Sequence, residues 1–435
     1  MAALLPRRSL TRRVATVVAA VGLVASACSP AASTSPTTAP TTAATAAATA
    51  TAAPVPVQGI SDTGEITLGA WIAQSGPLAV AANYWYGAQA YFDTVNDTGG
   101  VNGYKVKFTV IDDGGDPTKT VTAAKQLWEE DMVFAYFLPY GSGPFSAVKQ
   151  YIADNEIPVL FPSANPDLYF PKDAPATENI FGYLPPYSDL VGQLVTWANS
   201  NLGVKKLAVV HTNDAFGQAG IDEANALAAS LGIEIVDDIG YDSTETNYAP
   251  FGRRVADSGA DATLVWAIPG SAQTMTAAID SGYSGKWLLN EAFRGGFFLG
   301  QIKDLAGVAG NTYLNLYQLQ AFSDDPALND FKSVFPTKYP DGDPLFALAG
   351  WTTAAMFVQA VEEATADGSQ LTWPALAAAF ENWTNVKIAA GVGLTYSAQQ
   401  HIGALQAQVM RLDADGYHSE TDFELMPGLA KYADN

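Results

Sequence analysis

Residues 205–240 read KKLAVVHTNDAFGQAGIDEANALAASLGIEIVDDIG, and this stretch indicates the fold class. Lys206–His211 is a short apolar run that favours a buried strand. Gly217–Leu231 then carries apolar residues at helical spacing, and Glu234–Ile239 returns to a strand pattern. A helix between two apolar strands predicts that the strands are parallel and that the helix covers one face of their sheet.

The same alternation continues on both sides of this stretch. Toward the C-terminus we expect strands at Ala262–Ile268, Trp287–Leu289 and Thr312–Gln318, with helices at Ala249–Ser258 and Ala272–Ser281. Toward the N-terminus we expect strands at Glu65–Trp71, Lys105–Ile111, Val133–Leu138 and Pro158–Phe161, with helices at Gly87–Val95, Thr118–Trp128, Phe145–Ala153 and Asp189–Ser200. Two such runs predict an α/β protein with two doubly wound, parallel-sheet lobes.

The last part of the chain departs from this regular alternation. Helical patterns occur at Ala327–Lys338, Phe346–Glu363 and Pro374–Phe380. Gly393–Tyr396 and Gln406–Leu412 favour extended structure.

The N-terminus has the pattern of an export signal. Four arginines up to Arg13 precede the apolar stretch Val14–Ala27, and Cys28 follows. Ala25-Ser26-Ala27-Cys28 resembles the lipobox of bacterial lipoproteins, in which the Cys thiol accepts diacylglycerol. The alternative is an ordinary cleavage site after small residues. We expect residues 1–27 to be a lipoprotein signal peptide and Cys28 to carry the lipid anchor. The protein is then exported by the Sec or the twin-arginine route.

Residues 28–62 are expected to form a tether. Between Ser29 and Val57, 24 of 29 residues are Ala, Thr or Pro, and the others are Ser or Val. Such a segment has no bulky side chains for a core, and Pro and Thr disfavour a continuous helix. The working part of the protein is therefore expected outside the cytoplasmic membrane.

Composition excludes several classes of protein. The 435 residues include 44 acidic and 22 basic side chains, a formal charge of −22, which argues against nucleic-acid binding. One Cys excludes a disulfide framework and a multi-thiolate metal site, and three His residues argue against a His-rich metal centre. We expect no cofactor, and Asp341-Gly342-Asp343 only hints at a calcium turn, since no EF-hand spacing follows.

Several loops together resemble the periplasmic binding proteins of the leucine/isoleucine/valine-binding (type I) family, over about residues 63–425. The matching pieces are Ser75-Gly76-Pro77, Gly99-Gly100-Val101-Asn102-Gly103, Asp112-Asp113, Asp116-Pro117, Ser142-Gly143, Ile157-Pro158-Val159, Pro162-Ser163-Ala164-Asn165, Asn213-Asp214-Ala215-Phe216-Gly217 and Asn247-Tyr248. The resemblance implies two lobes that close on a ligand, joined by three crossovers near Tyr183–Pro186, Leu316–Leu319 and Ala390–Gly393. Lobe I is then expected at 63–184 and 317–391, and lobe II at 185–316 and 392–435.

The resemblance also implies a ligand site. Ser142 lies at an expected helix start, where free N–H groups suit a carboxylate, and the matching family residue holds the ligand's α-carboxylate. Ser163, Ala164 and Asn165 match positions that contact the ligand from the same lobe. Phe216 and Tyr248 match aromatic wall positions of the second lobe. Weaker candidates from the first lobe are Asn83, Tyr84 and Trp85.

One departure from the family concerns the ligand's charge. The amino-acid binders of this family have a Glu in the second lobe that pairs with the ligand's ammonium. We align its position with Gly270 or Ser271, and neither residue carries a charge. Either Glu291 takes over this role, or the ligand lacks an α-ammonium, because a buried ammonium without a carboxylate is costly. The ligand is then a branched-chain amino acid, a related amide or an organic acid.

Three function classes remain in competition. The first is a lipid-anchored, monomeric solute-binding protein, not an enzyme, that delivers a small molecule to the permease of an ABC importer. The second is a ligand sensor of the same fold that docks to a signalling partner. The third is an extracytoplasmic hydrolase that uses His211 or a carboxylate pair; the sequence has no G-x-S-x-G, P-loop or H-E-x-x-H motif to support it.

Overall fold

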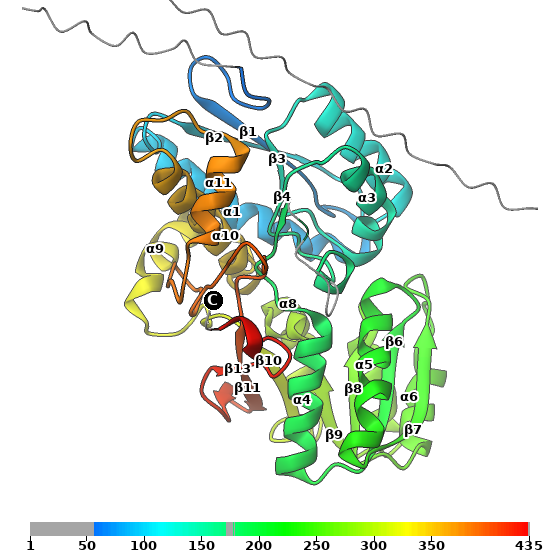
Figure 1. The fold of residues 1–435 in the computed structure, drawn as a ribbon. Coiled ribbons are helices and arrows are strands. Elements are labelled where there is room, and N and C mark those ends of the chain that lie inside the picture. The colour runs from blue at the N-terminus through cyan, green and yellow to red at the C-terminus, as the bar shows by residue number, and fades with distance from the viewer. Residues whose placement is uncertain (1–55, 171–176, 178, 434–435) are drawn as a thin grey trace, which may run out of the picture. The chain divides into compact units, whose positions relative to one another are not determined.

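The computed structural model describes residues 56–170, 177 and 179–433. The expected signal peptide, Cys28 and nearly all of the tether lie outside the described residues. Within the described part, the strands belong to two separate sheets, and the helices pack on their faces (Figure 1).

The first sheet is entirely parallel. Its strand order is β2-β1-β3-β4-β5. The strands are β1 (Glu65–Trp71), β2 (Lys105–Ile111), β3 (Ala135–Phe137), β4 (Val159–Leu160) and β5 (Ile180–Phe181), and the helices between them are α1 (Ala82–Asp97), α2 (Pro117–Lys125) and α3 (Ser142–Asp154). The carboxyl ends of parallel strands share one sheet edge, and the loops that follow β1, β3 and β4 therefore start at this edge.

The second sheet has a parallel centre and an antiparallel edge. Its order is β12-β11-β10-β9-β8-β6-β7, and β13 (Glu424–Leu425) pairs with β11. The parallel strands are β6 (Lys206–Thr212), β7 (Glu234–Tyr241), β8 (Ala262–Trp266), β9 (Lys286–Leu289) and β10 (Thr312–Leu316). β11 (Gln406–Asp413) runs antiparallel to β10 and β12 (Gly416–Ser419). The helices of this part are α4 (Tyr187–Leu202), α5 (Ala215–Leu231), α6 (Ala249–Asp257), α7 (Ser271–Asp280) and α8 (Gly296–Ile302).

Three later helices pack with the first sheet's helices. They are α9 (Asn329–Lys338), α10 (Pro344–Ala364) and α11 (Trp373–Glu381). α10 lies against α1 at very short range: a Cβ at Gly87 would be 1.8 Å from the carbonyl oxygen of Ala347, and one at Gly350 would be 1.9 Å from that of Tyr84. Only glycine allows two helix backbones to approach this closely.

α10 is also the one helix of the described residues that is long and apolar enough to cross a membrane, by length and composition. Its most apolar stretch is 89% buried inside the folded part, as expected for a core helix.

The chain passes between the two sheets three times. It leaves the first sheet after β5, leaves the second after β10, and returns to it at β11 (Figure 1). Isolated bridges tie these passages together, between Gly182 and Ile402 and between Gln318 and Gly391. These three passages lie near the three expected crossovers; the lobe boundaries drawn from the sequence stay a prediction.

The two-lobed α/β fold predicted from the alternation is confirmed, with differences in detail. The second sheet is mixed rather than parallel. Gly393–Tyr396 forms no strand, although Leu394 pairs with Val386. The expected helix at Thr118–Trp128 ends at Lys125 and continues as a π-helical turn, Gln126–Glu130. The two-residue strand β5 and helix α8 were not anticipated, because such short elements leave little periodicity to detect.

Candidate ligand-binding site

A cavity of about 170 Å³ lies where loops from both sheets meet. Its lining residues lie after strand ends or near the starts of helices, and they come from ten separate places in the chain. They are Leu78, Tyr84, Gly115, Pro117, Tyr140, Ser142, Gly143, Pro144, Ser163, Asp214, Phe216, Ser243, Ile268, Glu291, Ala292 and Phe346. Five of the predicted site residues are among them: Ser142, Ser163, Phe216, Glu291 and Tyr84.

Two neighbouring strands deliver Ser142 and Ser163 to the cavity. β3 and β4 are followed by Leu138 and Phe161, which have left-handed φ angles of 58° and 55°, and each precedes a proline. The two loops pair with each other, because Ser163 N–H donates to Pro139 O at 2.9 Å and Gly141 N–H donates to Ser163 O at 3.0 Å. Residues with left-handed φ angles are strained and need support from the surrounding structure. Here each loop supports the other through these two hydrogen bonds.

The hydroxyl of Ser142 has a proton to offer. Its oxygen accepts the N–H of Asn165 at 2.9 Å, and its own O–H has no protein acceptor in the described part of the chain. Ser142 and Gly143 also begin α3, and their backbone N–H groups have no acceptor among the described residues. Together with the partial positive charge of a helix start, these three donors suit a carboxylate.

Aromatic rings form two walls of the cavity. On the first-sheet side, Tyr84 lies 5.8 Å from Tyr140 and 5.4 Å from Phe346, measured between ring centroids. On the second-sheet side, Phe216 stacks on the fully buried Trp266, with centroids 5.8 Å apart. Such walls favour an apolar body on the ligand. Trp266 itself belongs to the core behind Phe216.

The second-sheet side contributes two carboxylates, Asp214 and Glu291, and the hydroxyl of Ser243. Asp214 caps α5 by accepting the N–H groups of Phe216 and Gly217 at 3.0 and 2.9 Å. Glu291 follows β9 at the start of the 3-10 turn Glu291–Arg294 and is 5% exposed. No Lys, Arg or His lines the cavity in the described part of the chain. Ligand groups near this side should therefore be hydrogen-bond donors.

Arg294 lies directly behind Glu291. Its guanidinium donates to the Glu291 carboxylate and lies over the ring of Tyr317, 5.3 Å from the centroid. Burial is the largest influence and would lower the pKa of Arg294, but the Glu291 carboxylate and three nearby tyrosines together hold the pKa above its ordinary value. The guanidinium is therefore charged although it is buried.

Tyr84 connects this ion pair to the first-sheet side. Burial raises the pKa of Tyr84 to about 12, while interactions of its hydroxyl with Arg294 and Ser163 oppose that rise. One polar chain thus runs from Glu291 through Arg294 and Tyr84 to Ser163, between groups carried by different sheets.

Comparison with known proteins identifies this architecture. The family described as periplasmic binding protein matches residues 65–417. The chain belongs to the periplasmic binding protein family. It is a type I solute-binding protein, with the two-lobed fold of that class.

Relatives of this binding protein are themselves solute-binding proteins. It is 24% identical over 323 residues to the Leu/Ile/Val-binding protein homolog 1 of Brucella melitensis biotype 1, covering 73% of this chain and 84% of that protein. It is 28% identical over 181 residues to homolog 3 of the same organism, covering 41% of this chain and 47% of that protein. The second match thus spans about half of the relative's length.

Two solved structures share the fold of this binding protein. A branched-chain amino acid ABC transporter protein from Thermus thermophilus, with bound valine, has a TM-score of 0.75 at 19% identity, covering 85% of this chain and 99% of that one. A fatty acid ABC transporter substrate-binding protein from Thermomonospora curvata has a TM-score of 0.72 at 22% identity, covering 87% and 96%. These likenesses concern the fold.

The other predicted site residues of this binding protein do not line the cavity. Asn165 is 5% exposed and donates from its side-chain amide to Ala215 O at 3.3 Å, which ties the two sides together. Ala164 is fully buried beside it. Trp85 is the next residue after Tyr84 in α1, and its ring contacts the ring of Tyr86, with centroids 5.2 Å apart. Asn83 accepts the N–H of Asp343 at 2.6 Å.

The last three predicted site residues contact other parts of the protein instead; they are Tyr248, Gly270 and Ser271. The Tyr248 ring covers Gly270, where a Cβ would lie 2.0 Å from the ring, and its hydroxyl donates to Glu245 O. Ser271 is buried and donates to Ala267 O. A direct ligand contact for these three residues stays a prediction, and their present contacts are with the protein.

His211, the proposed base of a hydrolase, also lies away from the cavity lining. Its Nε2 is 2.7 Å from Asp238 Oδ1 and its Nδ1 is 3.1 Å from Thr212 O. Both ring nitrogens are therefore paired with groups other than a Ser, Thr or Cys nucleophile. The arrangement offers no catalytic dyad at this histidine.

Sequence reasoning missed several lining residues, among them Tyr140, Asp214, Ser243, Ile268 and Phe346. Asp214 and Ile268 had a usable signal, because Ile268 ends one predicted strand and Asp214 lies three residues beyond the end of another. Phe346 had none: α10 is remote in sequence, and its packing on α1 brings the ring to the cavity. Arg294 is likewise hidden in sequence, since its role depends on its burial behind Glu291.

Proposed function

We propose that this protein is the extracytoplasmic, lipid-anchored substrate-binding component of an ABC importer. It captures a small solute between its two lobes and presents it to a membrane permease. Membership of the periplasmic binding protein family supports the location and the importer role. The lipid anchor is proposed from Cys28 and the lipobox-like residues before it.

The ligand we propose is a compact solute with a carboxylate or carbonyl oxygen and a neighbouring hydrogen-bond donor, such as a branched-chain amino acid or a related amide. The observation that carries this proposal is the opposition of donors at Ser142 and α3 to the acidic Glu291 across one cavity. The aromatic walls suit an aliphatic side chain. Two lining carboxylates make a ligand with a second negative charge unfavourable.

Size narrows the ligand further. An engineered protein cavity of about 150 Å³ holds benzene, and the present cavity is of similar size at about 170 Å³. Leucine and valine are ligands of this bulk, whereas the chain of a long fatty acid would need space outside the cavity. The fatty acid ligand of the Thermomonospora curvata protein is therefore the less favoured choice here.

A thermal-shift panel tests this function. The purified protein is heated with L-leucine, L-valine, 4-methylpentanamide, 4-methylpentanoate or octanoate. A ligand that binds only the folded protein stabilises it by about 2.7 kcal/mol at one hundred times its Kd. We expect leucine, valine or the amide to raise the melting temperature most. Stabilisation by octanoate alone would contradict the proposed ligand class.

A further inference from the structure

The charges around the cavity are unevenly compensated. Of its two lining carboxylates, Asp214 is held by backbone N–H groups at the start of α5 and by the Thr212 hydroxyl at 3.0 Å. Glu291 is held by a full positive charge, the guanidinium of Arg294. Glu291 and Arg294 are both buried, with side chains 7% and 4% exposed. Within the described residues, Arg294 is the cation that forms an ion pair with a lining carboxylate.

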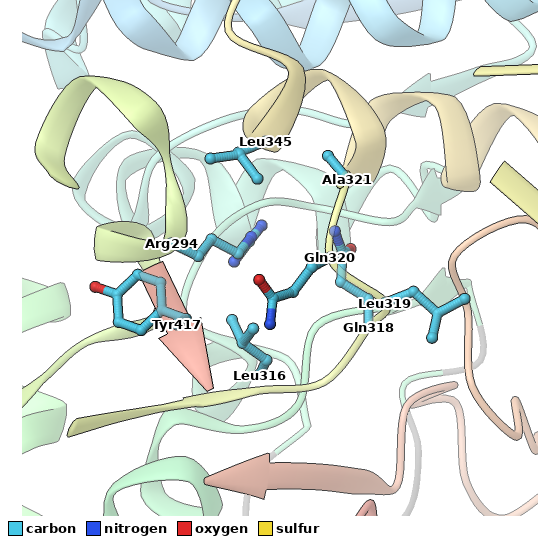
Figure 2. A pocket seen from close by; sticks show the side chains of 8 residues that line it. All are labelled: Arg294, Leu316, Gln318, Leu319, Gln320, Ala321, Leu345 and Tyr417. Atoms are coloured by element: carbon cyan, nitrogen blue, oxygen red, sulfur yellow. The ribbon is translucent and has the colours of Figure 1, made fainter. Parts of the chain in front are cut away.

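Arg294 is held by Glu291 and Tyr317, while its Nε has no hydrogen-bond partner among the described residues. Besides Glu291, its Nη2 lies 3.4 Å from the Tyr317 hydroxyl, and its guanidinium stacks over the Tyr317 ring. Behind it, a second cavity of only about 10 Å³ is lined by Arg294, Gln318, Gln320 and Tyr417 together with apolar residues. Figure 2 shows the Arg294 side chain extending into this narrow space toward Gln320. The guanidinium therefore has no room to swing away when a ligand arrives.

We propose that Arg294 is a specificity-determining residue that sets which nitrogen or oxygen donor the cavity accepts. By neutralising Glu291, Arg294 allows an uncharged donor, such as an amide or a hydroxyl, at the place where an unpaired glutamate would require an ammonium. The proposal rests on the proposed function, because it concerns the same cavity and ligand class.

The physical argument compares two ligands that differ in one group. An ammonium beside Glu291 is attracted by that carboxylate and repelled by Arg294 behind it. The repulsion cancels much of the favourable electrostatic energy of binding. A hydroxyl or amide N–H can still donate to the Glu291 oxygen that Arg294 leaves free, and it feels no net repulsion. Without Arg294, a buried unpaired carboxylate would favour the ammonium strongly.

The test measures binding of L-leucine and of L-2-hydroxy-4-methylpentanoate, which carries a hydroxyl in place of the ammonium. Titration calorimetry gives both Kd values for the wild type, Arg294→Gln, Arg294→Lys, Glu291→Gln and the double variant Glu291→Gln/Arg294→Gln. The readout is the ratio of the two Kd values, which a general loss of stability does not change.

The wild type should bind the two probes within about tenfold of each other, and Arg294→Gln should shift the ratio toward leucine by about tenfold to a hundredfold. Glu291→Gln should shift it toward the hydroxy acid. Arg294→Lys, which keeps the charge, and the neutral double variant should stay near the wild-type ratio. Melting curves of the unliganded proteins check that each variant is folded.

An unchanged ratio in folded Arg294→Gln would overturn the inference. If Arg294→Gln does not fold, the comparison of Glu291→Gln with the double variant decides: equal ratios in these two proteins would also overturn it. Binding of neither probe by any of the proteins would instead overturn the proposed ligand class, and the inference with it. The two failures are thus distinguishable.

Discussion

Ser142 combines two roles at the start of α3. Its oxygen receives the Asn165 N–H, which links the loops after β3 and β4, and its O–H remains free to donate into the cavity. The N-cap residue of α3 is Gly141, so Ser142 is the first residue of the helix and does not hold the position of an ordinary N-cap. This geometry favours a binding role for Ser142 over a purely structural one.

Replacing Ser142 by Ala should weaken ligand binding about tenfold to a hundredfold, because one hydrogen bond to a charged group contributes about 1.5–3 kcal/mol. The melting temperature of the unliganded protein should change little, since only the bond from Asn165 is lost. Calorimetry with the best ligand of the thermal-shift panel measures the effect. Ser146→Ala in the same helix, at a residue that does not line the cavity, serves as a control and should retain its affinity. Unchanged affinity in Ser142→Ala would argue against this carboxylate site.

Asp113 provides a test of electrostatics beside the cavity loops. It is fully buried and accepts the Thr120 hydroxyl at 2.6 Å, and burial raises its pKa above the ordinary 3.8. Because the folded-state pKa is raised, the contribution of Asp113 to stability is full below pH 3.8 and is lost as the pH rises through the folded-state value. Relative to Asp113→Asn, the wild type should therefore become less stable as the pH rises above about 4.

Denaturant unfolding at several pH values measures this difference. The neighbouring Asp112 is the control of opposite sign: burial opposes its ionisation, but hydrogen bonds from Gln74 and Gly114 outweigh it and lower its pKa. Relative to Asp112→Asn, the wild type should gain stability as the pH rises from acid values. Parallel stability curves for wild type and Asp113→Asn would contradict the assignment.

At the scale of elements, the crossing of α1 and α10 positions one aromatic wall of the cavity. α1 carries Tyr84 and α10 carries Phe346, and both rings line the cavity. The two backbones meet at Gly87 and Gly350. A Cβ at either position would lie within 2 Å of a backbone carbonyl oxygen of the other helix. A shift of one helix relative to the other would thus move a wall of the site.

Gly350→Ala should lower the free energy of unfolding by about 1–3 kcal/mol, because the added methyl group has no space at this crossing. Ligand affinity should fall as well, because the added methyl group would push against the backbone carbonyl of Tyr84, which lines the cavity. Gly300→Ala in α8 is a matched control with nothing within 4 Å of the new methyl group. There, stability should stay the same or rise by up to about 1 kcal/mol. Equal stabilities of the two variants would count against a tight crossing.

At the scale of the whole molecule, one chain supplies two sheets that are connected three times. The cavity depends on this arrangement, because Ser142 and Ser163 belong to the first sheet's loops and Phe216 and Glu291 to the second's. A ligand that contacts both sets of residues favours the arrangement in which they meet, and a permease can recognise that arrangement.

The proposed anchor makes its own prediction at this scale. Cells that produce the wild type should retain it in the membrane fraction, and Cys28→Ala should release it, because diacylglycerol needs the thiol. Fractionation followed by immunoblotting, with Ser26→Ala as a control in the same segment, measures the distribution. A Cys28→Ala protein that stays with the membrane as the wild type does would contradict lipid anchoring.

The sequence by itself was sufficient for the fold class. Strand and helix periodicities are local properties, and most of the expected elements occur within a few residues of their predicted places. Loop motifs at strand ends also identified Ser142, Ser163 and Phe216, because parallel strands bring their carboxyl ends to one edge. The charge pattern and the single cysteine led to the predictions about export and anchoring.

Only the tertiary structure decided which of the remaining candidates meet in one cavity. Tyr248 and Trp85 are turned toward protein neighbours, while Tyr140, Asp214 and Phe346 are brought to the cavity by strand order and by the crossing of α1 and α10. The same applies to charge: Glu291 in the sequence is an acidic loop residue, and burial against Arg294 makes it half of an ion pair. Such partnerships join residues through packing in three dimensions, and periodicity along the chain carries no record of them.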